Sequence, residues 1–161
     1  MAIRGVHHIN LAVEDMDLMR RFYRDGLGFE EVTAMDWGPG DPAGLTTGIR
    51  ESAASMAMLK CGNVMIELIQ YKLPPVEIGA PCQPYSRGYT HICLEISDID
   101  AEYERLLGHG MTFHSPPPPL ADRNYRAIYG RDPEGNLIEL QELFGQDNQF
   151  RLDTFDRLEA C

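Results

Sequence analysis

Long apolar runs are absent from this sequence of 161 residues. The longest runs have the length of a strand, so none of them can span a bilayer. The first residues also lack the apolar core and the small-residue cleavage site of a secretory signal, and they lead directly into a strand pattern. We therefore expect a cytoplasmic protein without a membrane partner.

Basic residues are scarce. The chain has 14 Lys and Arg against 25 Asp and Glu, a formal net charge of -11. Such a charge repels phosphate backbones, and no basic patch is visible in the sequence, so nucleic acid is not an expected partner. Four cysteines are present without a C-x-x-C pair, which favours reduced thiols over disulfides and argues against a zinc finger.

The composition that remains, 43% hydrophobic and 24% charged residues, is typical of a globular protein. Its most informative feature is an internal repeat: residues 8–15 (HINLAVED) return as residues 91–98 (HICLEISD). Apolar and more polar residues alternate in both copies, which predicts a strand with unlike faces. His8 and His91 lie on the more polar face of their strands.

Each predicted strand is followed by the signals of a helix. Asp15 and Asp98 are suitable N-caps. A helix-spaced apolar stripe follows each aspartate, and each stripe ends at a pair of glycines. The stripes are Met16, Met19, Phe22 and Tyr23 in the first copy, and Ile99, Tyr103, Leu106 and Leu107 in the second.

A second repeated element closes each copy, as residues 62–68 (GNVMIEL) and 135–140 (GNLIEL). Glu67 and Glu139 stand between aliphatic residues, so alternation turns them away from the apolar face and toward the side of the histidines. With further strand-like stretches at about residues 53–60 and 125–129, each copy reads as βαβββ. The sequence thus predicts an α+β fold of two βαβββ modules in one chain.

The length suits a single domain over residues 1–145. We expect module 1 at about residues 4–73, a proline-containing linker at about 74–87, and module 2 at about 88–145. The tail, residues 146–161, carries Phe150, Leu152, Phe155 and Leu158 at roughly helical spacing, which favours packing against the body or a second subunit.

The four repeated polar residues, His8, Glu67, His91 and Glu139, call for a physical reason. Each alone is better explained as an ordinary core or surface residue. Their recurrence in register, with no Lys or Arg alternating onto the same strand faces, favours one shared metal ion, because a carboxylate facing a sheet interior is costly when unpaired. Imidazole with carboxylate suits Zn, Ni, Co, Mn or Fe.

Three stretches carry a resemblance to a known family: residues 6–13 (VHHINLAV) with Phe22-Tyr23 and Leu27-Gly28-Phe29, residues 88–92 (GYTHI), and residues 132–140 (DPEGNLIEL). Together they resemble the vicinal oxygen chelate superfamily, which includes glyoxalase I, methylmalonyl-CoA epimerase, extradiol dioxygenases and the bleomycin and fosfomycin resistance proteins. The resemblance extends to about Leu143. It implies that the modules form an open barrel around a metal ion held by His8, Glu67, His91 and Glu139. It also suggests a homodimer acting on a small molecule, with the modules of a site pairing within one chain or between two.

The ligand set resembles the isomerase and epimerase branch of this superfamily more than its dioxygenases, which use two histidines and one carboxylate. Four protein ligands on an octahedral ion leave two adjacent positions for substrate oxygens, which suits an enolate stabilised by the metal. The resemblance implies Glu139 as the group that moves the proton. Glu51, spaced from Glu67 much as a catalytic glutamate is in methylmalonyl-CoA epimerase, is a second candidate, although a solvated charge at a strand start is the simpler explanation.

The expected function is therefore a metal-dependent isomerase, epimerase or lyase acting on a small oxygenated acid, thioester or hemithioacetal. One departure is Ala12, where glyoxalase I has an arginine for its glutathione substrate. Two alternatives remain open: an Fe(II) extradiol-type dioxygenase acting on a catechol, and a non-catalytic binding or resistance protein.

Overall fold

The computed structural model describes residues 3–120 and 124–155, and the predicted tail residue Leu158 lies outside them. The chain forms two compact units, Ala2–Ala80 and Pro81–Cys161. The boundary between the units falls within the stretch predicted as a linker. No helix in the described part of the chain is long and apolar enough to cross a membrane.

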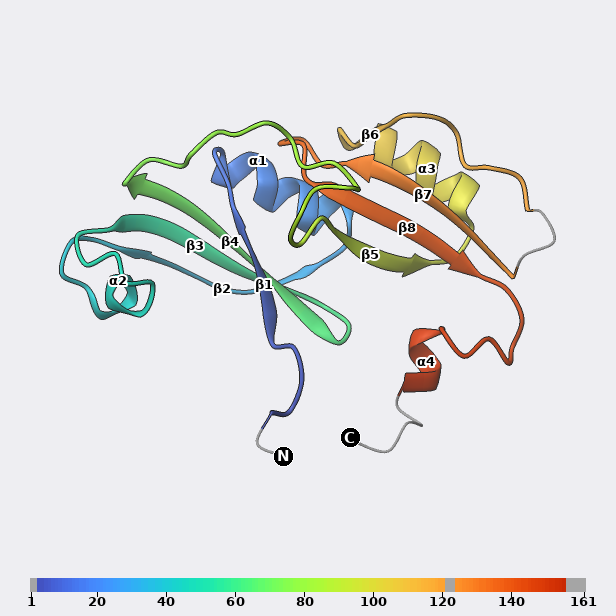
Figure 1. The fold of residues 1–161 in the computed structure, drawn as a ribbon, viewed down its shortest axis with the longest axis horizontal. Coiled ribbons are helices and arrows are strands. Elements are labelled where there is room, and N and C mark those ends of the chain that lie inside the picture. The colour runs from blue at the N-terminus through green and yellow to red at the C-terminus, as the bar shows by residue number, and fades with distance from the viewer. Residues whose placement is uncertain (1–2, 121–123, 156–161) are drawn as a thin grey trace. The chain divides into compact units, whose positions relative to one another are not determined.

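The first unit contains one four-stranded sheet in the order β1-β4-β3-β2 (Figure 1). Strand β1 runs parallel to β4, and the other neighbours are antiparallel. The elements are β1 (His8–Ala12), α1 (Met16–Arg21), the π-helical turn η1 (Phe22–Gly26), β2 (Glu30–Trp37), α2 (Pro42–Thr46), β3 (Ala53–Cys61) and β4 (Val64–Leu73).

The second unit repeats this topology, with the order β5-β8-β7-β6 and a parallel pairing of β5 with β8. Its elements are β5 (His91–Ile96), α3 (Ile99–Leu107), β6 (Thr112–Phe113), β7 (Tyr125–Arg131), β8 (Leu137–Leu143) and α4 (Leu152–Phe155). The predicted α+β class with two βαβββ modules is confirmed, and each sheet is open.

Local signals place the two long helices where they were expected. The Asp15 carboxylate accepts a hydrogen bond from the Leu18 N–H (2.9 Å), and Asp98 accepts one from Ala101 (3.1 Å), which satisfies donors left free at a helix start. The stripe residues are buried except for Tyr103, which is half-buried, and Leu107, which is 41% exposed.

Each sheet has a face that packs toward its helix and an opposite face, which we call the site face. Ile66 and Leu68 of β4, and Ile138 and Leu140 of β8, point to the helix side and are at most 1% exposed. Each such side chain contributes about 1.5–3 kcal/mol of transfer free energy to folding. Period-2 alternation then turns the intervening glutamates to the site face.

The site face of module 1 also carries a buried apolar cluster of Trp37, Ala54 and Ile69, against which Ala43 of α2 packs. Inside it, the Trp37 indole donates a hydrogen bond to the Ser52 hydroxyl (3.0 Å), and Ser52 is fully buried. The segment around α2 therefore covers the end of this face.

Candidate metal centre

Module 1 brings His8 and Glu67 together on neighbouring parallel strands. His8 Nε2 lies 3.6 Å from Glu67 Oε2, and the two side chains are 40% and 18% exposed. Asn10, directly opposite Glu67 in the register, donates a hydrogen bond to the same carboxylate oxygen (3.3 Å). The pair is thus partly shielded from water and held by a neutral neighbour.

The second ring nitrogen of His8 has its own partner. His8 Nδ1 lies 2.8 Å from His7 Nδ1, and the rings meet edge to face. Strict strand alternation would turn His7 away from His8. The difference arises because β1 begins at His8, so strand geometry does not constrain the preceding residue.

Module 2 holds the equivalent pair at a shorter distance. His91 Nε2 lies 3.2 Å from Glu139 Oε2, with side chains 30% and 15% exposed. His91 Nδ1 lies 2.8 Å from Thr90 Oγ1, and the Tyr129 hydroxyl lies 3.4 Å from His91 Nε2. Tyr129 stands opposite Glu139 in the register, and its ring contacts that of His91 edge to face.

The Glu139 carboxylate affects the groups on either side of it. Burial, and then the hydrogen bond and negative charge of Glu139, raise the pKa of Tyr129. Burial and the charge of Glu139 likewise raise the pKa of Cys93, on the neighbouring strand, to about 12. Near neutral pH the phenol is therefore a hydrogen-bond donor, and the thiol is a poor nucleophile.

The geometry of both pairs fits a shared divalent ion. Imidazole nitrogen and carboxylate oxygen bind such ions at about 2.0–2.2 Å, which sets two neighbouring ligand atoms about 3.0–3.5 Å apart. The separation of 3.2 Å in module 2 lies within this range, and that of 3.6 Å in module 1 lies just above it and is too long for a direct hydrogen bond. When Nδ1 donates to its partner, as it can in both histidines, the Nε2 lone pair is left for an ion.

No Lys or Arg within the described ranges forms an ion pair with Glu67 or Glu139. One basic residue does lie on the site face: the register places Arg131 of β7 beside Leu137. The sequence patterns of the ligand-bearing strands did not reveal it. Among the described side chains, no group of three His, Cys, Asp or Glu is close enough to hold a metal ion. Each module supplies a pair.

Glu51, the second predicted base, lies in the turn before β3 and is exposed. The β3 residue that pairs with Glu67 is Met58, in the second half of β3, so Glu51 does not stand opposite Glu67. In the described structure no hydrogen bond or ion pair links Glu51 to either His–Glu pair.

Three neighbours of the pairs escaped sequence reasoning: Asn10, Thr90 and Tyr129. Asn10 lies two residues after His8 on the same strand face, so alternation could have found it. Thr90 directly precedes its histidine. Tyr129 could be found only after the pairing of β7 with β8 was known.

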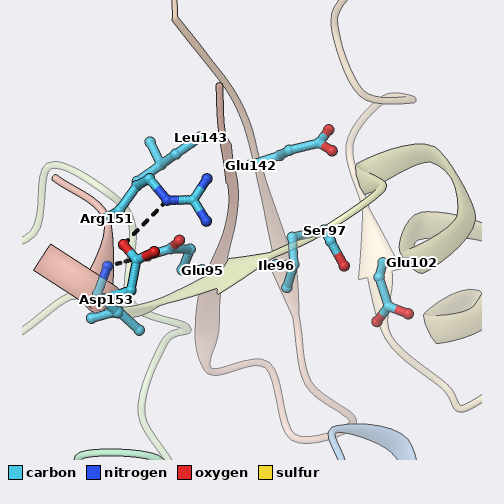
Figure 2. A pocket seen from close by; sticks show the side chains of 9 residues that line it. Glu95, Ile96, Ser97, Glu102, Glu142, Leu143, Arg151 and Asp153 are labelled. Carbon is cyan, nitrogen blue, oxygen red and sulfur yellow. Dashed lines mark hydrogen bonds and ion pairs between the residues drawn. The ribbon is translucent and has the colours of Figure 1, made fainter. Parts of the chain in front are cut away.

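Module 2 also contains an acidic cavity of about 590 Å³ beside the C-terminal segment (Figure 2). Its carboxylates already have structural partners. Glu95 accepts a hydrogen bond from the Leu152 N–H (2.6 Å), Asp153 pairs with Arg151 (3.2 Å), and Glu142 accepts the N–H of Asp98 (2.8 Å). These contacts attach α4 to β5 and cap α3, so we assign the cavity a structural role.

The family model for the Glyoxalase/Bleomycin resistance protein/Dioxygenase superfamily matches residues 5–140. The chain belongs to this superfamily, whose members typically bind a divalent metal ion and act on small molecules.

Individual relatives agree with this assignment. The chain is 28% identical to the 2-epi-5-epi-valiolone epimerase of an Actinomyces species, over 92% of this chain and 87% of that protein. It is also 28% identical to the protein YaeR of Escherichia coli, over 88% of this chain and 98% of YaeR. A crystal structure of a glyoxalase family protein from Bacillus cereus superposes with a TM-score of 0.79 at 28% identity, covering 90% of this chain and 99% of that one.

Proposed function

We propose that this protein is a metal-dependent isomerase, epimerase or lyase acting through an enolate on a small oxygenated acid, thioester or hemithioacetal. His8, Glu67, His91 and Glu139 would together hold one Zn, Ni, Co, Mn or Fe ion. The observation that carries this proposal is the repeated His–Glu pair, whose atoms are 3.6 and 3.2 Å apart, close to the spacing of two ligands of one ion. The epimerase relative supports the choice of reaction class.

When bound, a divalent ion supplies Lewis-acid stabilisation of the negative charge that develops on substrate oxygens. Glu139 would accept the proton from the carbon beside the carbonyl and return it. The Tyr129 hydroxyl, held protonated beside Glu139, would donate a hydrogen bond to a substrate oxygen at that position. Glu51 is kept as the alternative base.

Metal analysis of protein purified without chelators is the first test. We expect about one transition-metal ion per chain, and a marked loss of metal affinity in Glu67→Gln and in Glu139→Gln. Glu77→Gln is the matched control, because it makes the same charge change at an exposed position of the first unit. Folded protein that neither retains nor takes up a metal ion would refute the site.

The reaction is tested by exchange of substrate C–H with solvent deuterium, using 2-oxo acids, acyl thioesters and hemithioacetals. With each variant assayed at a metal concentration that loads it, we expect Glu139→Gln to abolish exchange and Glu51→Gln to leave it unchanged. The opposite pattern would move the base to Glu51.

One observation favours the dioxygenase alternative. Asn10 donates to the Glu67 oxygen that faces His8, and that pair is the longer of the two. If Glu67 only hydrogen-bonds, then His8, His91 and Glu139 would form the two-histidine, one-carboxylate set of Fe(II) oxygenases. Oxygen uptake with catechols by the Fe(II)-loaded protein, retained in Glu67→Gln, would establish this alternative.

We also propose a homodimer, because members of the superfamily are typically dimeric. Light scattering measured during size-exclusion chromatography would give the mass directly. A mass of one chain at micromolar concentration would exclude a stable dimer.

A further inference from the structure

A cavity of about 620 Å³ lies beside the His91–Glu139 pair, within module 2. Tyr129, which contacts the His91 ring, forms part of its wall. Arg131 and Leu137 also line it, and they are direct partners in the register of β7 and β8. Since Leu137 is in turn the partner of His91, the cavity lies over the same sheet face as the candidate metal ligands.

The cavity has a mixed lining of the kind that small organic ligands require. Leu137 is apolar, Tyr129 offers a ring as well as a hydroxyl, and Pro84 of the linker adds a further apolar surface. Basic groups come from Arg131 and from His114, which follows β6 and is exposed, and Gln83 and Thr112 add neutral polar groups. A few polar groups set in an apolar wall orient a ligand and give it specificity.

The charge of Arg131 distinguishes this cavity. Its guanidinium donates to two neutral acceptors, the carbonyl oxygens of Gly135 (2.6 Å) and Cys82 (2.9 Å). Within the described ranges, no carboxylate forms an ion pair with Arg131, and none lines the cavity. By contrast, Arg126 on the opposite face of β7 is paired with Asp100 at 2.6 Å.

Although the chain has a net charge of -11, no carboxylate of the described residues pairs with the Arg131 guanidinium. The two backbone carbonyls fix the position of the Arg131 side chain but do not neutralise it. The positive charge is therefore available to a ligand in the cavity, and an arginine held in place is well suited to a carboxylate, which its planar fork can bind through two hydrogen bonds.

We propose that this cavity binds a carboxylate group of the substrate. The carboxylate would lie against Arg131 and His114, with the apolar part of the molecule against Leu137 and Pro84. This inference rests on the proposed function in one respect, since it places the reacting end of the same molecule beside Tyr129 and the His91–Glu139 pair. It narrows the substrate to a small organic acid whose acid group is separate from the reacting oxygens.

The test measures binding of simple probes to the full chain by calorimetry, so it needs no knowledge of the reaction. Benzoate, benzamide and phenyl phosphate share a ring and differ in the charge and shape of the polar group. We expect benzoate to bind at least about tenfold more tightly than benzamide, because only benzoate can form a charged pair with the guanidinium. Equal binding of the two would overturn the proposal, and a clear preference for phenyl phosphate would replace the carboxylate with a phosphate.

Three variants locate the site. Arg131→Gln should remove the preference for benzoate, and His114→Gln should weaken it. Arg126→Gln, the same charge change on the opposite face of β7, should leave the preference intact. If Arg131→Gln unfolds because the Cys82 contact is lost, Arg131→Lys keeps the charge, and a reduced but measurable preference is then expected.

Repeating the titration with a chelator separates this proposal from the metal site. Binding of benzoate that survives chelation supports the Arg131 cavity even if the chain proves to hold no metal. Binding that disappears with the chelator, and that is insensitive to Arg131→Gln, would assign the carboxylate to the metal instead and overturn the inference.

Discussion

Thr90→Val tests whether the contact between Thr90 and His91 prepares that histidine to bind a metal ion. A histidine that binds an ion through Nε2 carries its proton on Nδ1, and here Nδ1 lies 2.8 Å from the Thr90 hydroxyl. The hydroxyl would therefore accept the Nδ1–H and fix both the tautomer and the orientation of the ring. Valine has nearly the same shape but cannot accept this hydrogen bond.

The expected loss follows from the strength of such supporting contacts. Removing the hydrogen-bond partner of a metal-binding histidine weakens metal affinity by about 10- to 100-fold, or about 1.4–2.8 kcal/mol. The loss of metal affinity should lie toward the lower end of this range, because the His91 side chain is 30% exposed and water can replace the Thr90 hydroxyl. Thr90 precedes β5, so the free energy of unfolding should change little.

Competition with a chromophoric chelator measures the affinity. Thr90→Ser keeps the hydroxyl and should bind metal as the wild type does, while Thr33→Val repeats the chemical change at an exposed position of β2. Unchanged affinity in Thr90→Val would show that His91 needs no support from Thr90. Equal losses in the Ser and Val variants would show that the effect does not follow the hydroxyl, which only the Ser variant keeps.

Two further predictions concern the scaffold of each module. Ser52→Ala should lower the free energy of unfolding of the first unit by about 1–3 kcal/mol, since it leaves the indole N–H of the buried Trp37 without its acceptor. Urea unfolding, followed by the fluorescence of this sole tryptophan, measures the change. A change below about 0.5 kcal/mol would contradict the prediction. In the second unit, the hydrogen bonds from Arg126 lower the pKa of Asp100, so this pair stabilises the fold above the ordinary aspartate pKa and loses its effect as the pH falls through the lowered value. Arg126→Met should return the pKa of Asp100 to the ordinary range in a carbon-13 NMR titration, and an unchanged pKa would exclude Arg126 as the cause.

Sequence reasoning succeeded where the signal is local and repeated. The alternation around Glu67 and Glu139 requires only that each segment be a strand with one buried face, and the structure buries the flanking aliphatic residues on that face. The helix caps depend on residues three positions apart. Such patterns can be read without knowing what lies across the sheet.

Other elements depend on contacts distant in sequence. β2 was not located, because it is an exposed edge strand, with a register shift between Glu31 and Thr33, and shows little apolar alternation. β6 was missed because it has two residues. The role of Arg131 depends on the carbonyl of Cys82 in the linker, which no local pattern indicates.

The same dependence on pairing explains why the two halves of the candidate site differ. The position opposite the glutamate is Met58 in module 1 and Tyr129 in module 2, on strands of equivalent order. The His–Glu pair is therefore repeated, but its surroundings are not. Met58 can offer only apolar contact, whereas Tyr129 offers a protonated hydroxyl beside His91 and forms part of the wall of the Arg131 cavity. If the proposal is correct, both modules hold the metal ion, and substrate recognition depends mainly on module 2. Tyr129→Phe should then impair turnover without lowering metal content, a separation that no variant of the four ligands could produce.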